Sequence, residues 1–173
     1  PCAKSINKWY PNETSNCTFC QTEDSLEHYF CDCDKVRPFW IWFKEWINEL
    51  YQCNITLSTL DLIFGITNVN KLILFDVLNL CILFAKDFIK KCKQTDLDVS
   101  TGKYKVLLRN RLNVERLILI ERNEENIFVE KWQILYNTLW SSPSLFIYVF
   151  TAHPNPKPFV IKHYISDTYY FPV

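Results

Sequence analysis

Three cysteines and one histidine near the start of the chain have the spacing of a metal site. They are Cys17, Cys20, His28 and Cys33, in the order C-x2-C-x7-H-x4-C. Thiolate and imidazole groups are the donors that zinc prefers, and two cysteines separated by two residues can bind one ion from a tight turn. Four protein ligands leave no position open for a substrate. The spacing therefore predicts one structural Zn²⁺ ion and no catalytic residue.

The same cysteines allow other interpretations. The chain contains eight cysteines, a number that is typical of disulfides in a short secreted protein. We favour the metal because the sequence starts with no secretory signal, the other cysteines are scattered, and Cys81 lies in an apolar helical run. The fourth ligand stays open between Cys31 and Cys33, since either thiolate could complete the set after His28. We favour Cys33.

Two short elements must position these ligands. We call residues 17–33 the knuckle. Thr18 and Phe19 suit a tight turn between the first two cysteines, and a helical turn over residues 25–30 would carry His28 towards them. Cys33 would lie just beyond the end of that turn.

The rest of the chain predicts helices. Residues 35–52 show an amphipathic pattern, in which Phe39, Trp40, Phe43, Trp46, Ile47 and Leu50 form a stripe expected to be buried. Trp42 lies off that stripe, so we expect it on a contact surface. A short helical turn near residues 57–61, ending at Gly65, precedes longer helices over 69–93, 104–122 and 127–140. The apolar run in 69–93 is shorter than the roughly 20 residues that a membrane span needs.

The expected fold class is mainly α: a small C2HC zinc knuckle docked on a bundle of about four helices, with an irregular or β-like C-terminal tail. Residues 1–52 would hold the knuckle and the aromatic helix, and residues 53–140 the bundle with its basic helix ends. Residues 141–173 are rich in proline and aromatic residues and show no helical period. They predict either a pair of strands, at 145–150 and 159–164, or a disordered extension.

Charge is distributed unevenly along the chain. Its formal net charge is zero and its pI about 7.2, so the whole sequence does not indicate a nucleic-acid binder. Residues 1–60, however, hold five basic against eight acidic residues, whereas residues 86–122 hold ten basic against five acidic ones. A basic surface, if there is one, is expected after the acidic knuckle. The alternative is that the arginines of 104–122 form only a solubilising face.

A family resemblance accompanies this pattern. Its parts are the Cys-Thr-Phe-Cys run at 17–20, the acidic pair Glu23-Asp24, Leu26-Glu27-His28, an aromatic pair, Cys33, and Phe39-Trp40. This arrangement closely resembles the zinc-binding region near the C-terminus of non-LTR retrotransposon reverse transcriptases of the long interspersed element type. Residues 80–93 look like the alanine-lysine helix that follows it in those polyproteins. The chain departs from the family by Asp34, where a proline is usual, and by the additional thiol of Cys31.

The resemblance implies a non-catalytic segment of a reverse transcriptase polyprotein, which would bind RNA or DNA during target-primed reverse transcription. Its partners would be the element transcript, the target site and the rest of the polyprotein, in the nucleus and in cytoplasmic ribonucleoprotein, without a membrane. No paired-aspartate polymerase motif or endonuclease pattern occurs in the chain. We therefore expect no enzymatic activity from this segment, although the full polyprotein that it resembles is an RNA-directed DNA polymerase.

Particular side chains would make the nucleic-acid contacts. Trp42 or Tyr29 would stack on an unpaired base. Phosphate contacts would come from Lys86, Lys90, Lys91, Lys93, Lys103, Lys105, Arg109 and Arg111. Two alternatives remain open: a zinc-organised protein-protein interaction module, which the acidic knuckle favours, and the translation product of a decayed element copy.

Overall fold

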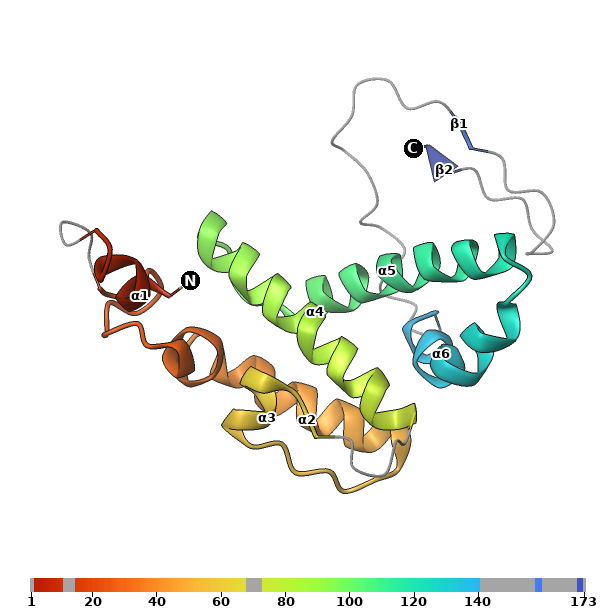
Figure 1. Cartoon of the computed structure of the whole chain (residues 1–173), viewed down its shortest axis with the longest axis horizontal. Helices are drawn as coiled ribbons and strands as arrows, with labels where there is room; N and C mark the ends of the chain where they lie inside the picture. The colour runs from red at the N-terminus through yellow and green to blue at the C-terminus, as the bar shows by residue number, and fades with distance from the viewer. Residues whose placement is uncertain (1, 11–14, 68–72, 141–157, 160–170, 173) are drawn as a thin grey trace. The chain divides into compact units, whose positions relative to one another are not determined.

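The computed structural model describes residues 2–10, 15–67, 73–140, 158–159 and 171–172. These residues form six α-helices, one π-helical turn and two short strands (Figure 1). The chain divides into two compact units, residues 1–142 and 143–173. The mainly helical class that the sequence predicts is confirmed.

The N-terminal part of the first unit contains α1 (Ala3–Asn7), the knuckle and the π-helical turn η1 (His28–Asp32). The sequence pattern did not predict α1, which has only five residues. The helical turn expected over 25–30 is present, but it lies slightly later and is wider than an α-helical turn.

Helix α2 (Arg37–Tyr51) follows the knuckle directly. Pro38 lies in its first turn, where the missing amide proton leaves no helical hydrogen bond unmade. The helix ends at Gln52, whose left-handed conformation has φ 49°. The predicted stripe is buried, except that its last member is only half-buried; the buried members are Phe39, Trp40, Phe43, Trp46 and Ile47.

Polar side chains of α4 (Ile73–Thr95) form hydrogen bonds with residues 54–67, which we call the connector. The connector includes α3 (Thr59–Phe64), which starts with a capping box between Ser58 and Asp61. The Asn79 side chain accepts a hydrogen bond from the Ile66 amide at 2.6 Å and donates one to the Ile66 carbonyl at 3.0 Å. Lys86 Nζ donates to the Ile63 carbonyl at 2.8 Å. These contacts explain why polar residues interrupt an otherwise apolar helix.

Helices α5 (Thr101–Glu121) and α6 (Glu125–Trp140) pack on each other across a short connection (Figure 1). The Trp132 indole donates to Glu115 at 2.9 Å, and Arg116 pairs with Glu125 at 3.0 Å. The buried Tyr104 hydroxyl donates to the Cys81 carbonyl at 2.9 Å and so ties α5 to α4. One continuous core therefore joins the long helices α2, α4, α5 and α6.

Two further findings complete the fold. In the second unit, β1 (Pro158–Phe159) and β2 (Phe171–Pro172) pair antiparallel. The strand predicted at 145–150 lies outside the described residues, and of the one predicted at 159–164 only the first residue is described. Among the helices of the described part, none has the length and apolar character that crossing a membrane would require.

Candidate metal centre

A tight turn presents the first two cysteines. The Cys17 amide donates to the Thr22 carbonyl at 2.7 Å, and the Gln21 amide donates to the Cys17 carbonyl at 2.9 Å. Gln21 adopts a left-handed conformation with φ 64°, which lets the chain reverse. Beside this turn, Asn16 and Glu23 form an antiparallel bridge. The result is a closed loop of backbone from which both thiols project towards one point.

The π-helical turn η1 presents the other two ligands. The Ser25 hydroxyl accepts a hydrogen bond from the His28 amide at 3.0 Å and so starts the turn. The Cys33 amide then donates to the His28 carbonyl at 3.1 Å, five residues back along the chain. This wide turn brings Cys33 beside His28. The Cys33 carbonyl in turn accepts a hydrogen bond from the Arg37 amide at 2.8 Å, which places the ligand at the start of α2.

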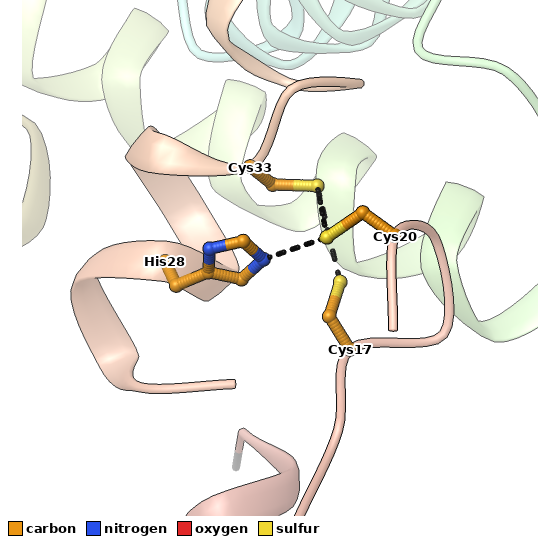
Figure 2. Close-up of side chains that lie close together, drawn as sticks. All are labelled: Cys17, Cys20, His28 and Cys33. Carbon is orange, nitrogen blue, oxygen red and sulfur yellow. Dashed lines mark hydrogen bonds between the residues drawn. The ribbon is translucent and has the colours of Figure 1, made fainter. Parts of the chain in front are cut away.

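The four predicted ligands meet at one point, as Figure 2 shows. Their donor atoms all lie within 4.8 Å of one another. Cys33 Sγ lies 3.8 Å from both Cys17 Sγ and Cys20 Sγ, and Cys20 Sγ lies 3.1 Å from His28 Nε2. Metal–sulfur bonds of about 2.3 Å at tetrahedral angles place two sulfur atoms about 3.8 Å apart. The sulfur spacing therefore matches a tetrahedral metal site.

Burial divides the ligands into two kinds. The thiols of Cys17 and Cys33 are fully buried, whereas Cys20 and His28 are half-buried. Burial raises the pKa of the Cys33 thiol to about 12 in the metal-free chain. Burial also opposes ionisation of Cys20, but hydrogen bonds from Thr22 and the neighbouring thiols outweigh it and lower the pKa of that thiol to about 6. The surroundings of Cys20 thus favour the thiolate, which is the form of the side chain that binds a metal.

Cys31 lies apart from this group. Of the cysteines, histidines and carboxylates in the described ranges, only the four ligands named above form a group that could hold a metal ion. Cys31 is buried within η1, and burial raises the pKa of its thiol to about 11. A buried neutral thiol of this kind is a core residue.

Two buried charged residues lie beside the ligands, a place that the sequence pattern did not predict for either of them. Lys93 Nζ lies 3.3 Å from Cys17 Sγ and 3.5 Å from Asp24 Oδ1, and both side chains are buried. One signal for Lys93 was present in the sequence. It follows the buried Ile89 by four residues, so it falls on the apolar face of α4.

The predicted phosphate-binding residues separate into three groups. Lys93 and Arg109 are only 5% and 6% exposed, so neither lies on the exposed basic surface from which phosphate contacts were expected. The Arg109 guanidinium lies over the Trp140 ring at 5.1 Å. Lys86 is bonded to the connector, and Lys105 lies over the Trp42 and Trp46 rings. Four basic side chains remain exposed: Lys90, Lys91, Lys103 and Arg111.

The two aromatic residues proposed to stack on bases are already engaged. Trp42 is half-buried rather than exposed, and its ring stacks on Trp46 at 5.1 Å. The Tyr29 ring lies 4.2 Å from Lys93 Nζ. A base could therefore reach these rings only in competition with contacts that the fold already makes.

Comparison of the chain with protein-family models, with curated proteins and with solved structures finds no match. The resemblance to retrotransposon reverse transcriptases therefore stays a prediction. The geometry of the Cys3His cluster carries the functional argument.

Proposed function

We propose that the chain is a zinc-stapled helical module, in which one structural Zn²⁺ ion fixes the knuckle to the helices. The observation that carries this proposal is the meeting of Cys17, Cys20, His28 and Cys33 within 4.8 Å. Three thiolates and an imidazole form a soft donor set, which suits zinc and disfavours magnesium or calcium. Four ligands at tetrahedral spacing are typical of a structural site.

The ion would act as a staple because its ligands contact several helices. Cys33 lies where α2 begins, and the buried Trp40 of α2 donates its indole hydrogen to the Phe30 carbonyl of η1 at 2.5 Å. Lys93 of α4 lies 76 residues further along the chain and contacts Cys17. Binding the ion would therefore order the knuckle and hold it on two helices at once, because metal binding adds to the free energy of folding.

Cobalt substitution tests the ligand geometry. With Co²⁺ in place of Zn²⁺, the protein should show the intense d–d absorption of a tetrahedral ion together with sulfur-to-cobalt charge transfer. Weak octahedral bands without charge transfer would contradict the proposed ligand set.

Nucleic acid is the partner that the family resemblance suggests, and we include it in the proposal. Support comes from the exposed Lys90, Lys91 and Lys103, which lie near the junction of α4 and α5. Acidic side chains reduce the positive charge of this surface in two ways. Lys91 pairs with Asp87 at 2.8 Å, and Asp96 and Asp98 are exposed at the same junction. We therefore expect moderate, sequence-independent binding that rests on phosphate contacts.

A charge-removal variant tests the nucleic-acid proposal. Filter binding to RNA and to DNA would be measured over a range of salt for K90Q/K91Q/K103Q. If all three lysines contact phosphates, the negative slope of log K against log salt should become shallower by about two to three. The matched control is K4Q/K8Q/K35Q, because those three lysines are also exposed and one of them, Lys4, pairs with an acid as Lys91 does. Equal slopes for the parent and both variants would contradict the proposal.

A protein-protein interaction module is the second candidate. The observation that favours it is a set of exposed apolar side chains on α5 and α6: Val114 is 56% exposed, Ile118 43% and Ile134 54%. Such side chains add little to stability in water and can dock a partner. If the filter-binding experiment finds no salt-dependent affinity, this candidate takes precedence.

A further inference from the structure

A buried ammonium group lies against the ligand cluster. Lys93 comes from the last turns of α4, far from the knuckle in sequence, and its side chain is only 3% exposed. Its Nζ lies 3.3 Å from Cys17 Sγ and 3.5 Å from Asp24 Oδ1. A lysine is rarely buried unless it is paired, because the charge loses its hydration. The fold therefore places a cation next to a metal ligand.

Neighbouring side chains accept hydrogen bonds from that ammonium group or lie over it. An ammonium group has three hydrogens to donate. One points to the Cys17 sulfur and one to the Asp24 carboxylate, and the Tyr29 ring lies 4.2 Å from the nitrogen, where its electron-rich face attracts a cation. The Phe19 ring, 5.7 Å away, belongs to the turn between Cys17 and Cys20. Every one of these partners belongs to the knuckle.

The net charge of a filled metal site explains why a cation is needed beside Asp24. Zn²⁺ with three thiolates and a neutral imidazole carries one net negative charge. Asp24 adds another, so the buried region would hold two negative charges without Lys93 and holds one with it. Groups outside the ligand set commonly orient metal ligands and adjust their donor strength in this way.

We propose that Lys93 is a positioning residue of the metal centre: its ammonium donates a hydrogen bond to the Cys17 thiolate, offsets the negative charge of the filled site and fixes the end of α4 to the knuckle. This inference rests on the proposed zinc site. It assigns to Lys93 a role inside the protein in place of the phosphate contact that its sequence context suggested.

The hydrogen bond has a spectroscopic signature that a packing role alone would not produce. A donated hydrogen bond stabilises the sulfur lone pair, so removing it makes electron transfer from sulfur to metal easier. In Co²⁺-substituted K93M, the sulfur-to-cobalt charge-transfer band should therefore move to lower energy. Zinc affinity, measured by competition with a chromogenic chelator, should fall about 10- to 100-fold.

A second variant separates this effect from the cost of taking the Lys93 ammonium away from Asp24. K93M/D24N removes both buried charges and restores the net charge of the parent site. It should keep the fold, show the same band shift as K93M, and bind zinc more tightly than K93M does. D24N alone keeps the ammonium, so its band should stay at the parent position. The control K90M changes an exposed lysine of the same helix and should leave both readouts unchanged.

The outcomes distinguish this inference from the proposed function. If the parent protein binds no metal, both proposals fail. If the parent binds one zinc, and folded K93M/D24N keeps the parent band position and affinity, only the role of Lys93 is overturned. A band shift in the two lysine variants, absent from D24N and K90M, supports it.

Discussion

At the scale of single residues, the choice between Cys31 and Cys33 shows what local backbone geometry decides. Both follow His28 closely, and the spacing alone left the fourth ligand open. The wide turn η1 brings the Cys33 amide to the His28 carbonyl and buries the Cys31 side chain away from the other ligands. The π-helical turn thus decides which of the two cysteines joins the other ligands.

The first prediction follows from that geometry. Cys33→Ser should lose the metal, because a serine hydroxyl is a much weaker ligand for zinc than a thiolate. Cys31→Ser should retain about one zinc per chain, although it should lower the melting temperature by placing a hydroxyl in the core. Metal analysis of both purified variants checks this. The opposite result would make Cys31 the ligand.

The second prediction concerns thiols that the metal does not use. Burial raises the pKa of Cys31 to about 11 and that of Cys81 to about 12. A raised pKa keeps a thiol neutral, so at pH 8 both thiols stay protonated and react slowly. Iodoacetamide should therefore leave both residues unmodified in the native protein and label them in denaturant, as read by mass spectrometry. Rapid labelling of either residue in the native protein would show that its side chain is accessible and not buried.

Some residues of the site could be predicted from the sequence and others could not. The ligand spacing is local, so Cys17, Cys20 and His28 were predictable from zinc chemistry alone. The place of Lys93 beside the ligands was not, because its position on the apolar face of α4 does not reveal which residues it contacts. Only the packing of α4 on the knuckle buries it and brings it to Asp24.

At the scale of elements, the aromatic helix α2 supports the metal centre. Its predicted stripe is buried, and Trp40 is hydrogen-bonded to the Phe30 carbonyl of η1. Trp42, which the pattern placed on a contact surface, is half-buried because Trp46 and Lys105 cover part of its ring. Helical periodicity gives the direction of a side chain but does not reveal that a later helix covers it.

The third prediction compares these two tryptophans. Trp40→Ala should destabilise the protein by about 3–5 kcal/mol, because it removes a large buried ring and one hydrogen bond. Trp42→Ala should cost less, about 1–2 kcal/mol, since it removes ring contacts at a partly exposed position. Urea unfolding followed by far-UV circular dichroism measures both. A larger loss for Trp42→Ala than for Trp40→Ala would mean that the orientation of α2 is wrong.

Helix boundaries were predictable within a few residues because they depend on local signals. Gly65, with φ 92°, ends α3, and Pro38 lies in the first turn of α2. Helix α5 starts at Thr101, three residues earlier than periodicity indicates, because its first residues are polar and carry no apolar period. The contacts that Asn79 and Lys86 make with the connector could not be predicted, because they join residues distant in sequence.

At the scale of the whole molecule, charge is distributed differently in the fold than along the sequence. The excess of basic residues over 86–122 suggested a broad phosphate-binding surface. The fold removes Lys93 and Arg109 from that surface and leaves exposed acids beside the remaining lysines. Part of the basic character therefore serves internal packing: one cation lies against the ligand cluster and another against Trp140.

The central claim is that the fold of the knuckle depends on one bound zinc ion. We expect metal analysis of the purified protein to find about one zinc per chain. Removing it with a chelator should abolish the protection of the hydrogen-bonded amides of Cys17, Gln21 and Cys33 against hydrogen exchange, and adding zinc should restore it. The core of α2, α4, α5 and α6 should exchange more slowly than the knuckle throughout. A metal-free protein in which those three amides stay as protected as before would contradict the claim.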